Sequence, residues 1–145
     1  MIKKLQDVLH AEIPLSQAIG IEVIEYHDNA LTLFAPLKNN INHKCTAFGG
    51  SLYSVSVLAG WGLLYLLLNK NDLPGHIVIQ ESNIQFLKPV AFDIIAKCSF
   101  TSAEQHEKFI KTYKRKGMAR IQLETRINND TETCVIFKGS YVVHT

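Results

Sequence analysis

The stretch Leu52–Leu68 reads LYSVSVLAGWGLLYLLL and holds 17 residues without a charge. Its length is at the lower edge of what a membrane-spanning helix needs. Two serines and two glycines interrupt it, and single lysines, Lys44 and Lys70, stand beside it in place of a basic cluster. A helix that is apolar on every side is equally suited to the buried centre of a globular domain. We therefore interpret the stretch as a core helix and expect no membrane insertion.

The segments around this helix read mostly as strands, because their apolar residues alternate with polar ones. Strand patterns outnumber helix patterns and do not alternate with them as parallel βαβ units would. A helix without a polar face needs a sheet that curls around it. The sequence therefore predicts an α+β fold in which a curved, mostly antiparallel sheet wraps one long apolar helix. The expected strands are 21–26, 31–35, 77–87, 93–101, 119–127 and 134–144, with further helices at 2–11 and 102–116.

The ends of the expected helix 102–116 are marked by residues typical of helix caps. Ser102 followed by Gln105 matches a capping box, and Gly117 is a typical left-handed terminator. From Glu104 to Arg120 the chain carries six bases and two acids, a net charge of +4. This segment is therefore the most basic surface that the sequence predicts.

Length and composition predict a single domain over residues 1–145. Hydrophobic residues make up 47% and charged residues 19%, which excludes a disordered chain. A net charge of +2 is too small to indicate nucleic-acid binding. The cysteines, Cys45, Cys98 and Cys134, have no zinc-site spacing, and no signal peptide is recognisable. We expect reduced thiols, no metal and a cytoplasmic location.

Three segments together carry a resemblance to a known family. They are IPLSQAIGIEV at 13–23, NHKCTAFGGSLYSVSVLAGWGLLYL at 42–66 and FLKPV at 86–90. A short N-terminal helix, two strands, an Asn-containing loop, a Gly-Gly pair and a long apolar helix resemble the hotdog fold. Within the hotdog acyl-CoA thioesterase superfamily, segment 42–66 resembles the YiiD-type thioesterase domain. The resemblance covers nearly the whole chain and implies a hydrolytic thioesterase.

Many hotdog thioesterases place an Asn six residues before a His-Gly-Gly motif at the start of the long helix. Here Asn42 precedes Phe48-Gly49-Gly50 by six residues, with Phe48 in the place of the His. The resemblance implies that Asn42 binds substrate or water, that the Gly50 N–H binds the thioester oxygen, and that Phe48 and Gly49 contact the substrate. The first turn of a helix suits this role, because its N–H groups are unpaired and its end is partly positive. The two glycines could instead form only a tight turn into the helix.

The family pattern also places a carboxylate on the helix nine residues after the His, and here that position is Val57. Because the helix carries no acid, the base must come from elsewhere. Glu81, inside the apolar strand that follows the helix, is our candidate, since a buried carboxylate can act as a general base. Strand alternation places it on the face of Ile79 and Asn83, opposite Ser82. A solvated or ion-paired strand residue is the alternative.

Other candidate substrate contacts come from the helix and from the basic segment. Ser51, Tyr53 and Ser54 occupy the first turns of the helix, where Ser54 or Tyr53 could orient a water molecule. Serines on an apolar helix can instead bond to their own i−4 carbonyls. Lys114 and Arg115 could receive the phosphates of coenzyme A or of a carrier-bound phosphopantetheine. A solvated helix face is the alternative for these two.

We therefore expect a thioesterase that hydrolyses an acyl-CoA or acyl-carrier-protein thioester by water attack. A non-catalytic acyl-thioester binding or assembly domain remains open because the helix carboxylate is absent. A hydroxyacyl-thioester dehydratase is a third possibility, disfavoured by Phe48 and Val57. No cofactor is expected beyond the coenzyme A or phosphopantetheine of the substrate. The low charged fraction and the resemblance predict a homodimer or a dimer of dimers.

Overall fold

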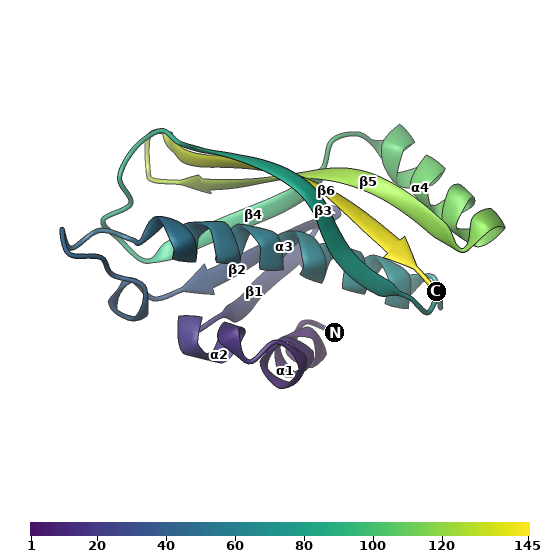
Figure 1. Cartoon of the computed structure of the whole chain (residues 1–145), viewed down its shortest axis with the longest axis horizontal. Coiled ribbons are helices and arrows are strands. Elements are labelled where there is room, and N and C mark those ends of the chain that lie inside the picture. The colour runs from purple at the N-terminus through teal and green to yellow at the C-terminus, as the bar shows by residue number, and fades with distance from the viewer.

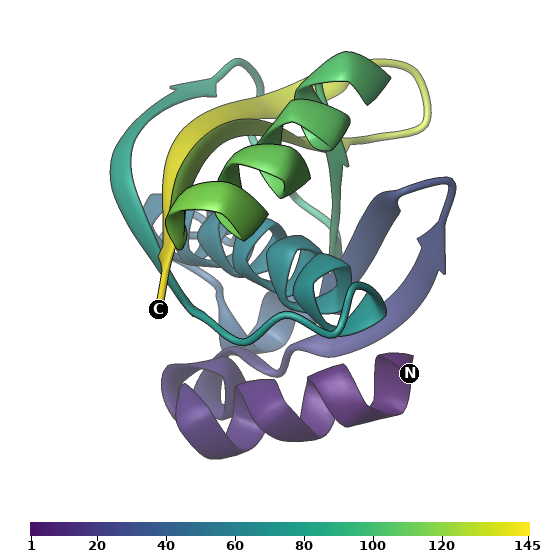
Figure 2. The same cartoon turned by 90° about the vertical axis from the view of Figure 1, so that its right-hand side faces the viewer.

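The apolar stretch forms α3 (Gly49–Lys70), the central helix of the computed structural model, which describes residues 1–145. At 1.5 Å per residue this helix is about 33 Å long. Figures 1 and 2 show the sheet curving around it and the N-terminal helices lying on its other side. By length and composition α3 could cross a membrane, but 67% of its most apolar window is buried inside the protein. The helix is therefore the core of the fold.

Six antiparallel strands form one curved sheet in the order β1-β2-β4-β5-β6-β3. The predicted α+β fold is confirmed, and every predicted strand agrees with the structure to within one residue at either end. Long apolar residues of the strands pack on α3 and build a single core cluster of 33 buried residues, which explains why a helix without a polar face is stable here. The strands are β1 (Glu22–His27), β2 (Ala30–Ala35), β3 (His76–Phe86), β4 (Ile94–Phe100), β5 (Met118–Asn128) and β6 (Thr133–His144).

The N-terminal segment forms two helices, of which only the first was predicted. α1 (Ile2–Glu12) buries Leu5 and Leu9 against the core. α2 (Leu15–Ile19) follows directly, with Pro14 at its N-cap, and ends where Gly20 adopts φ 80°. The sequence did not indicate α2 because a five-residue helix is too short to show helical periodicity. A 3-10 turn, η1 (Leu37–Asn39), lies in the loop before α3.

Helix α4 (Ala103–Lys116) has the caps that the sequence predicted. The Gln105 N–H donates to Ser102 Oγ at 3.1 Å, and Gly117 ends the helix with φ 72°. Its buried residues are Phe109 and Tyr113, and the Tyr113 hydroxyl donates to the Pro74 carbonyl. α4 therefore lies beside the C-terminal end of α3, far from the loop that leads into α3 (Figure 1).

Candidate functional site

The N-terminus of α3 has two backbone N–H groups without a partner. Phe48 is the N-cap residue, with φ −65° and ψ 134°, and its side chain caps nothing. The N–H groups of Ser51 and Leu52 donate to the Phe48 carbonyl at 2.9 and 3.0 Å, whereas those of Gly49 and Gly50 make no backbone hydrogen bond. Two free donors at the positive end of a long helix can hold an oxygen atom that gains negative charge.

Two exposed aromatic rings flank these donors. Phe48 is 57% exposed, and its ring lies so close to Gly50 that a Cβ there would overlap it. Phe86 is 53% exposed, and its ring would be 3.6 Å from a Cβ at Gly49. Gly50 therefore lets the ring of Phe48 pack on the backbone, next to the free N–H. Phe48, Gly49 and Gly50 form the start of α3, and their contact with a substrate stays a prediction.

The side chain of Asn42 makes hydrogen bonds within the loop that precedes α3. Its Oδ1 accepts from the N–H groups of Lys44 and Thr46 at 2.9 and 3.1 Å, and its Nδ2 donates to Thr46 Oγ1 at 2.9 Å. The side chain thus has a structural role that the sequence pattern did not reveal. Its contact with substrate or water stays a prediction.

Asn40 fixes the start of α3, although the sequence did not single it out. The residue is 3% exposed, and its Nδ2 donates to the carbonyls of Pro36 and Ile19 at 2.7 and 3.0 Å. Its own carbonyl accepts from the Phe48 N–H at 2.7 Å. Asn40 therefore ties the residue before Gly49 to α2 and to the loop. Its role shows in its burial, which the sequence of this Asn-rich loop does not reveal.

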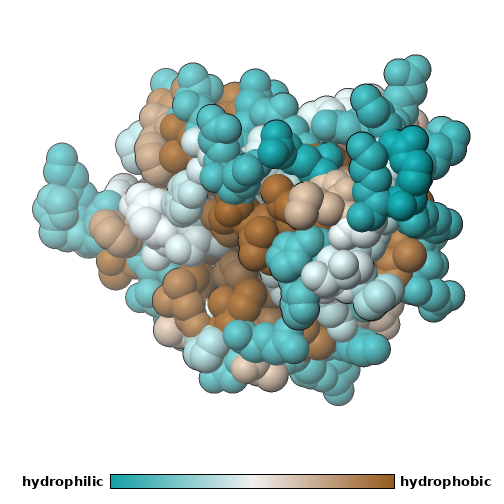
Figure 3. Space-filling model, turned by 45° about the vertical axis from the view of Figure 1, so that its right-hand side comes forward, coloured by the Kyte–Doolittle hydropathy of each residue, from teal (hydrophilic) through white to brown (hydrophobic).

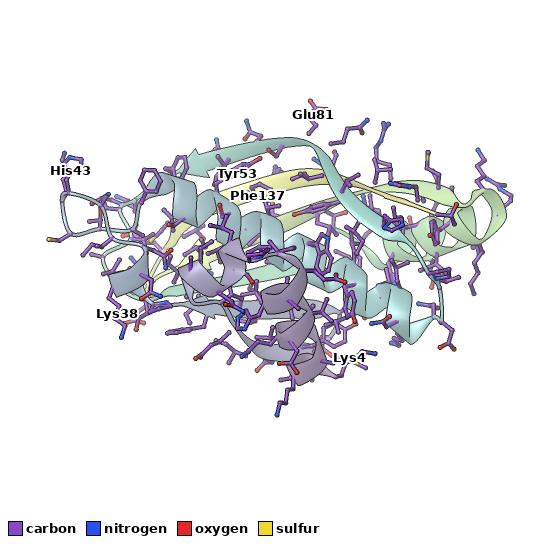
Figure 4. The ribbon with its side chains drawn as sticks, turned by 60° about the horizontal axis from the view of Figure 1, so that its bottom comes forward. Lys4, Lys38, His43, Tyr53, Glu81 and Phe137 are labelled. Carbon is purple, nitrogen blue, oxygen red and sulfur yellow. The ribbon has the colours of Figure 1, made fainter.

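A polar pair lies between α3 and β3, one helical turn beyond Gly50. The hydroxyl groups of Tyr53 and Ser82 are 2.7 Å apart, and the Tyr53 ring meets that of Phe137 edge to face at 5.6 Å. Figure 4 shows Tyr53 and Phe137 beside each other between the helix and the sheet. Tyr53 was predicted as a substrate contact, whereas the sequence did not single out Ser82. The two hydroxyls can hold a water molecule close to the helix N-terminus.

The helix serines differ in what they bond. Ser56 Oγ donates to the Leu52 carbonyl at 2.8 Å, which is the i−4 bond that we weighed for this helix. Ser51 and Ser54 are half-buried and make no side-chain hydrogen bond. The Ser54 hydroxyl is therefore available to a water molecule or a substrate.

Glu81 is exposed and lies on the face of β3 that is turned away from α3. A register shift between Ile79 and Glu81 adds one residue to β3 relative to β6 and reverses the alternation. As a result Ile79 and Ser82 are half-buried, while Glu81 and Asn83 are exposed. The prediction that Glu81 shares the face of Ile79 is therefore wrong, whereas its place opposite Ser82 and on the face of Asn83 is as predicted. Figure 4 shows the Glu81 side chain pointing out of the molecule.

Exchanging Glu81 for Gln tests the expectation from the sequence that it is the base, against which its exposed position in the chain argues. A carboxylate in bulk solvent cannot take a proton from water held at Gly50, so we expect Glu81→Gln to keep kcat within about threefold of the parent, far from the 100-fold or greater loss of a missing general base. The measurement is steady-state hydrolysis of an acyl thioester. A drop of about 100-fold or more would show that Glu81 reaches a site in the assembled protein.

The predicted phosphate ligands lie at the other end of α3. Lys114 and Arg115 occupy the last turn of α4, next to Tyr113, which bonds to Pro74 just beyond the C-terminus of α3. Since α3 is about 33 Å long, these bases cannot reach a thioester at Gly50 of the same chain. The structure does not bring them into the candidate site.

The cysteines take no part in this site. Cys98 and Cys134 are buried, Cys45 is exposed, and all three are free. Burial raises the pKa of the Cys98 thiol to about 12, so it stays protonated and unreactive.

A family model described as "Putative thioesterase (yiiD_Cterm)" matches residues 2–145. The match therefore includes the Asn42 loop, the Gly49-Gly50 pair, α3 and β3.

Solved structures share the fold over almost the whole chain. A protein of unknown function from Chlorobaculum tepidum TLS is 38% identical, with a TM-score of 0.93 over 99% of this chain and 93% of that chain. A protein described as a putative thioesterase from Shewanella oneidensis is 29% identical, with a TM-score of 0.89 over 99% and 97%. A thioesterase from Haemophilus influenzae is 14% identical, with a TM-score of 0.74 over 99% and 90%, and shows the fold alone.

Proposed function

The chain belongs to the Putative thioesterase (yiiD_Cterm) family, and from this premise we propose that it hydrolyses the thioester of an acyl-CoA or of an acyl-carrier protein. The observation that carries the proposal is the pair of free N–H groups at Gly49 and Gly50. They lie at the start of the central helix of a hotdog fold, beside the Tyr53–Ser82 hydroxyl pair. Family, fold and free donors thus point to the same chemistry.

In the proposed mechanism the thioester carbonyl oxygen accepts a hydrogen bond from the Gly50 N–H. A water molecule held by the Tyr53 hydroxyl, with Ser82 and Ser54 close by, attacks the carbonyl carbon. The oxygen becomes negative as the new C–O bond forms, and fixed donors stabilise it best at this point. The C–S bond then breaks, one proton of the water passes to the leaving thiolate and the other is released to solvent, so that a free thiol and a carboxylate leave. Asn42 keeps the loop beside the reacting carbonyl in place.

A thiol-release assay with both classes of donor tests this proposal. We expect saturable release of one thiol per thioester consumed, with acyl-CoA and acyl-carrier-protein substrates run side by side. Tight binding of a non-hydrolysable acyl-CoA analogue without any release would favour the non-catalytic binding domain instead. The three free cysteines fit a reducing compartment, and we place the enzyme in the cytoplasm.

We propose that two copies of the chain associate through β3. This strand is the last of the sheet, so one of its edges has no partner over 11 residues. It contains neither Lys nor Pro, two residues that usually protect a free edge, and its protective features are Glu81 and one bulge. The half-buried residues Trp61 and Tyr65 of α3 line a hollow together with His76 and Ile77 at the start of β3, and Figure 3 shows hydrophobic surface gathered in a hollow of the molecule. A second copy is the partner that would pair with this edge.

Changing one exposed edge residue tests the dimer. Val78 is 47% exposed on β3, and a Lys there would place two charges at the interface of a symmetric pair. We expect the parent to sediment at about twice 16.3 kDa and Val78→Lys to raise the dissociation constant about 10-fold or more. Ile95→Lys, an exchange at a 40% exposed site on β4, is the matched control. A stable, active 16.3 kDa monomer would contradict the dimer, and four-fold mass would show a dimer of dimers.

The dimer gives Lys114 and Arg115 a proposed role in the site of the partner subunit. β3 runs back along α3, so that Phe86 lies beside Gly49, and Pro74 and Gly75, just before β3, lie beside Tyr113 of α4. A two-fold axis through β3 reverses this order and brings α4 of one copy to the Gly50 end of the other. The bases would then meet the phosphates of the coenzyme A or phosphopantetheine that belongs to the substrate.

A further inference from the structure

A pocket of about 300 Å³ opens beside the first turn of α3. Its apolar lining comes from the loop before α3, from α3, from the end of β3 and from the segment that follows β3. Leu52 and Val90 are 4% and 1% exposed and form its inner wall, whereas Leu87 is 49% exposed and stands at its outer side. The apolar residues that line it are Ala47, Leu52, Phe86, Leu87 and Val90.

Backbone hydrogen bonds fix the walls of this pocket. The Ala47 N–H donates to the Val90 carbonyl at 2.7 Å, and the Leu87 N–H donates to the Cys134 carbonyl at 2.7 Å. The loop before α3, the segment after β3 and β6 are therefore held together. Such a preformed apolar pocket is the usual form of a small-molecule site.

The pocket is continuous with the two free donors, because Gly49 lines it and carries one of them. A thioester whose oxygen bonds at Gly49-Gly50 has its acyl chain at the mouth of this pocket. We propose that the pocket is the acyl subsite and that it selects saturated acyl chains of short to medium length. The proposal rests on the thioesterase function and adds the substrate class.

The volume sets the chain length. A cavity of about 150 Å³ holds the six carbons of one benzene, so a pocket of about 300 Å³ holds at most about twelve carbon atoms, and fewer because its outer side is open to solvent. A longer chain leaves its remaining methylenes in water and gains nothing from them. The selected class is therefore acyl groups of about six to ten carbons.

Charge in the pocket also favours an uncharged acyl group. Lys88 is the one charged residue of its lining, and its Nζ is 3.9 Å from Glu132 Oε2. The charge of Lys88 is thus already paired with that of Glu132, and the pocket offers no unpaired positive charge to a carboxylate on the substrate. A dicarboxylic acyl group is disfavoured for this reason.

A series of saturated acyl-CoA substrates from acetyl to palmitoyl tests the subsite. We expect kcat/KM to rise roughly fourfold for each added methylene until the pocket is full, at about eight carbons, and then to level or fall. Leu87→Trp fills the pocket and should move the optimum to shorter chains by two or more carbons. Leu87→Ala enlarges it and should move the optimum to longer chains. Ile95→Ala, at an exposed site on β4, is the control and should keep the dependence of kcat/KM on chain length that the parent shows.

The outcomes separate the two proposals. Three outcomes overturn the pocket assignment and leave the thioesterase function standing. They are a dependence of kcat/KM on chain length that neither Leu87 variant changes, a preference for palmitoyl, and a preference for a glutaryl group paired with Lys88. Failure to hydrolyse any thioester overturns both. Because Leu87 is half exposed, its variants should fold, and their thermal unfolding temperatures confirm this before the kinetics are compared.

Discussion

Replacing Gly50 by Pro should lower kcat about 100- to 1,000-fold, because it deletes the N–H proposed to stabilise the developing oxyanion. Proline is tolerated in the first turn of a helix, where no intrahelical bond is lost. Gly50 is the second residue of α3 and its N–H bonds to no backbone group, so the exchange removes a donor with little damage to the fold. Circular dichroism and thermal unfolding show whether α3 is retained, and single-turnover kinetics measure the chemical step.

Gly50→Ala is the matched control, because alanine keeps the N–H and adds only a methyl group. The added Cβ would overlap the ring of Phe48, but that ring is 57% exposed and can move aside. We expect Gly50→Ala to change KM more than kcat and to keep kcat within about 10-fold of the parent. Equal kcat values for the Pro and Ala variants would remove the Gly50 N–H from the mechanism.

Replacing Gly60 by Ala should destabilise the fold by about 2 kcal/mol, the largest effect on stability that we expect from a single methyl group. A Cβ at Gly60 would overlap the phenol of Tyr141, which is 1% exposed. The Tyr141 hydroxyl donates to the Val57 carbonyl at 2.8 Å, and burial raises the pKa of Tyr141, so the group remains a donor. The ring therefore cannot move without losing a buried hydrogen bond. This cost exceeds the gain of about 1 kcal/mol that alanine brings to a helix.

Gly62→Ala is the control on the same helix. There the nearest atom to the new Cβ is Leu31 Cδ2 at 2.7 Å, the end of a flexible side chain. We expect a change of less than about 1 kcal/mol, because the helix propensity of alanine offsets the adjustment of Leu31. Chemical denaturation measures both variants. Equal stability of Gly60→Ala and Gly62→Ala would show that Tyr141 does not restrain α3.

The fold could be predicted because its signals are local. The uncharged stretch Leu52–Leu68 requires burial on all sides, and alternation over each strand identifies the elements that bury it. Caps such as Ser102 and Gly117 mark where α4 begins and ends. The short helix α2 escaped prediction, since five residues after Pro14 are too few to show a period.

The candidate site could be predicted only in part, because part of it depends on contacts distant in sequence. The Phe48-Gly49-Gly50 turn is a local motif, and the structure bears out its place at the start of α3. The place of Ile79 on the same face as Ser82 depends on one extra residue in β3, which no alternation pattern reveals, and the pairing of Tyr53 with Ser82 depends on how α3 lies against β3. The engagement of Asn42 in its own loop depends on the fold of residues 42–47.

Charge patterns located the basic segment but not its position relative to the site. Lys114 and Arg115 are on one exposed helix turn, as their spacing predicts. Their position beyond the far end of α3 follows from the contact of Tyr113 with Pro74, which joins segments 39 residues apart. Only the tertiary structure places these bases at the far end of α3 from Gly50 in their own chain, and their role in a second subunit is our proposal.

The most direct test of the thioesterase function is thiol release from octanoyl-CoA by the parent protein and by Gly50→Pro under the same conditions. We predict steady release of one thiol for each octanoate formed by the parent, and release about 100- to 1,000-fold slower by the folded variant. Release by the parent at no more than the rate of a protein-free blank would contradict the account. Equal release by the parent and the variant would do so as well.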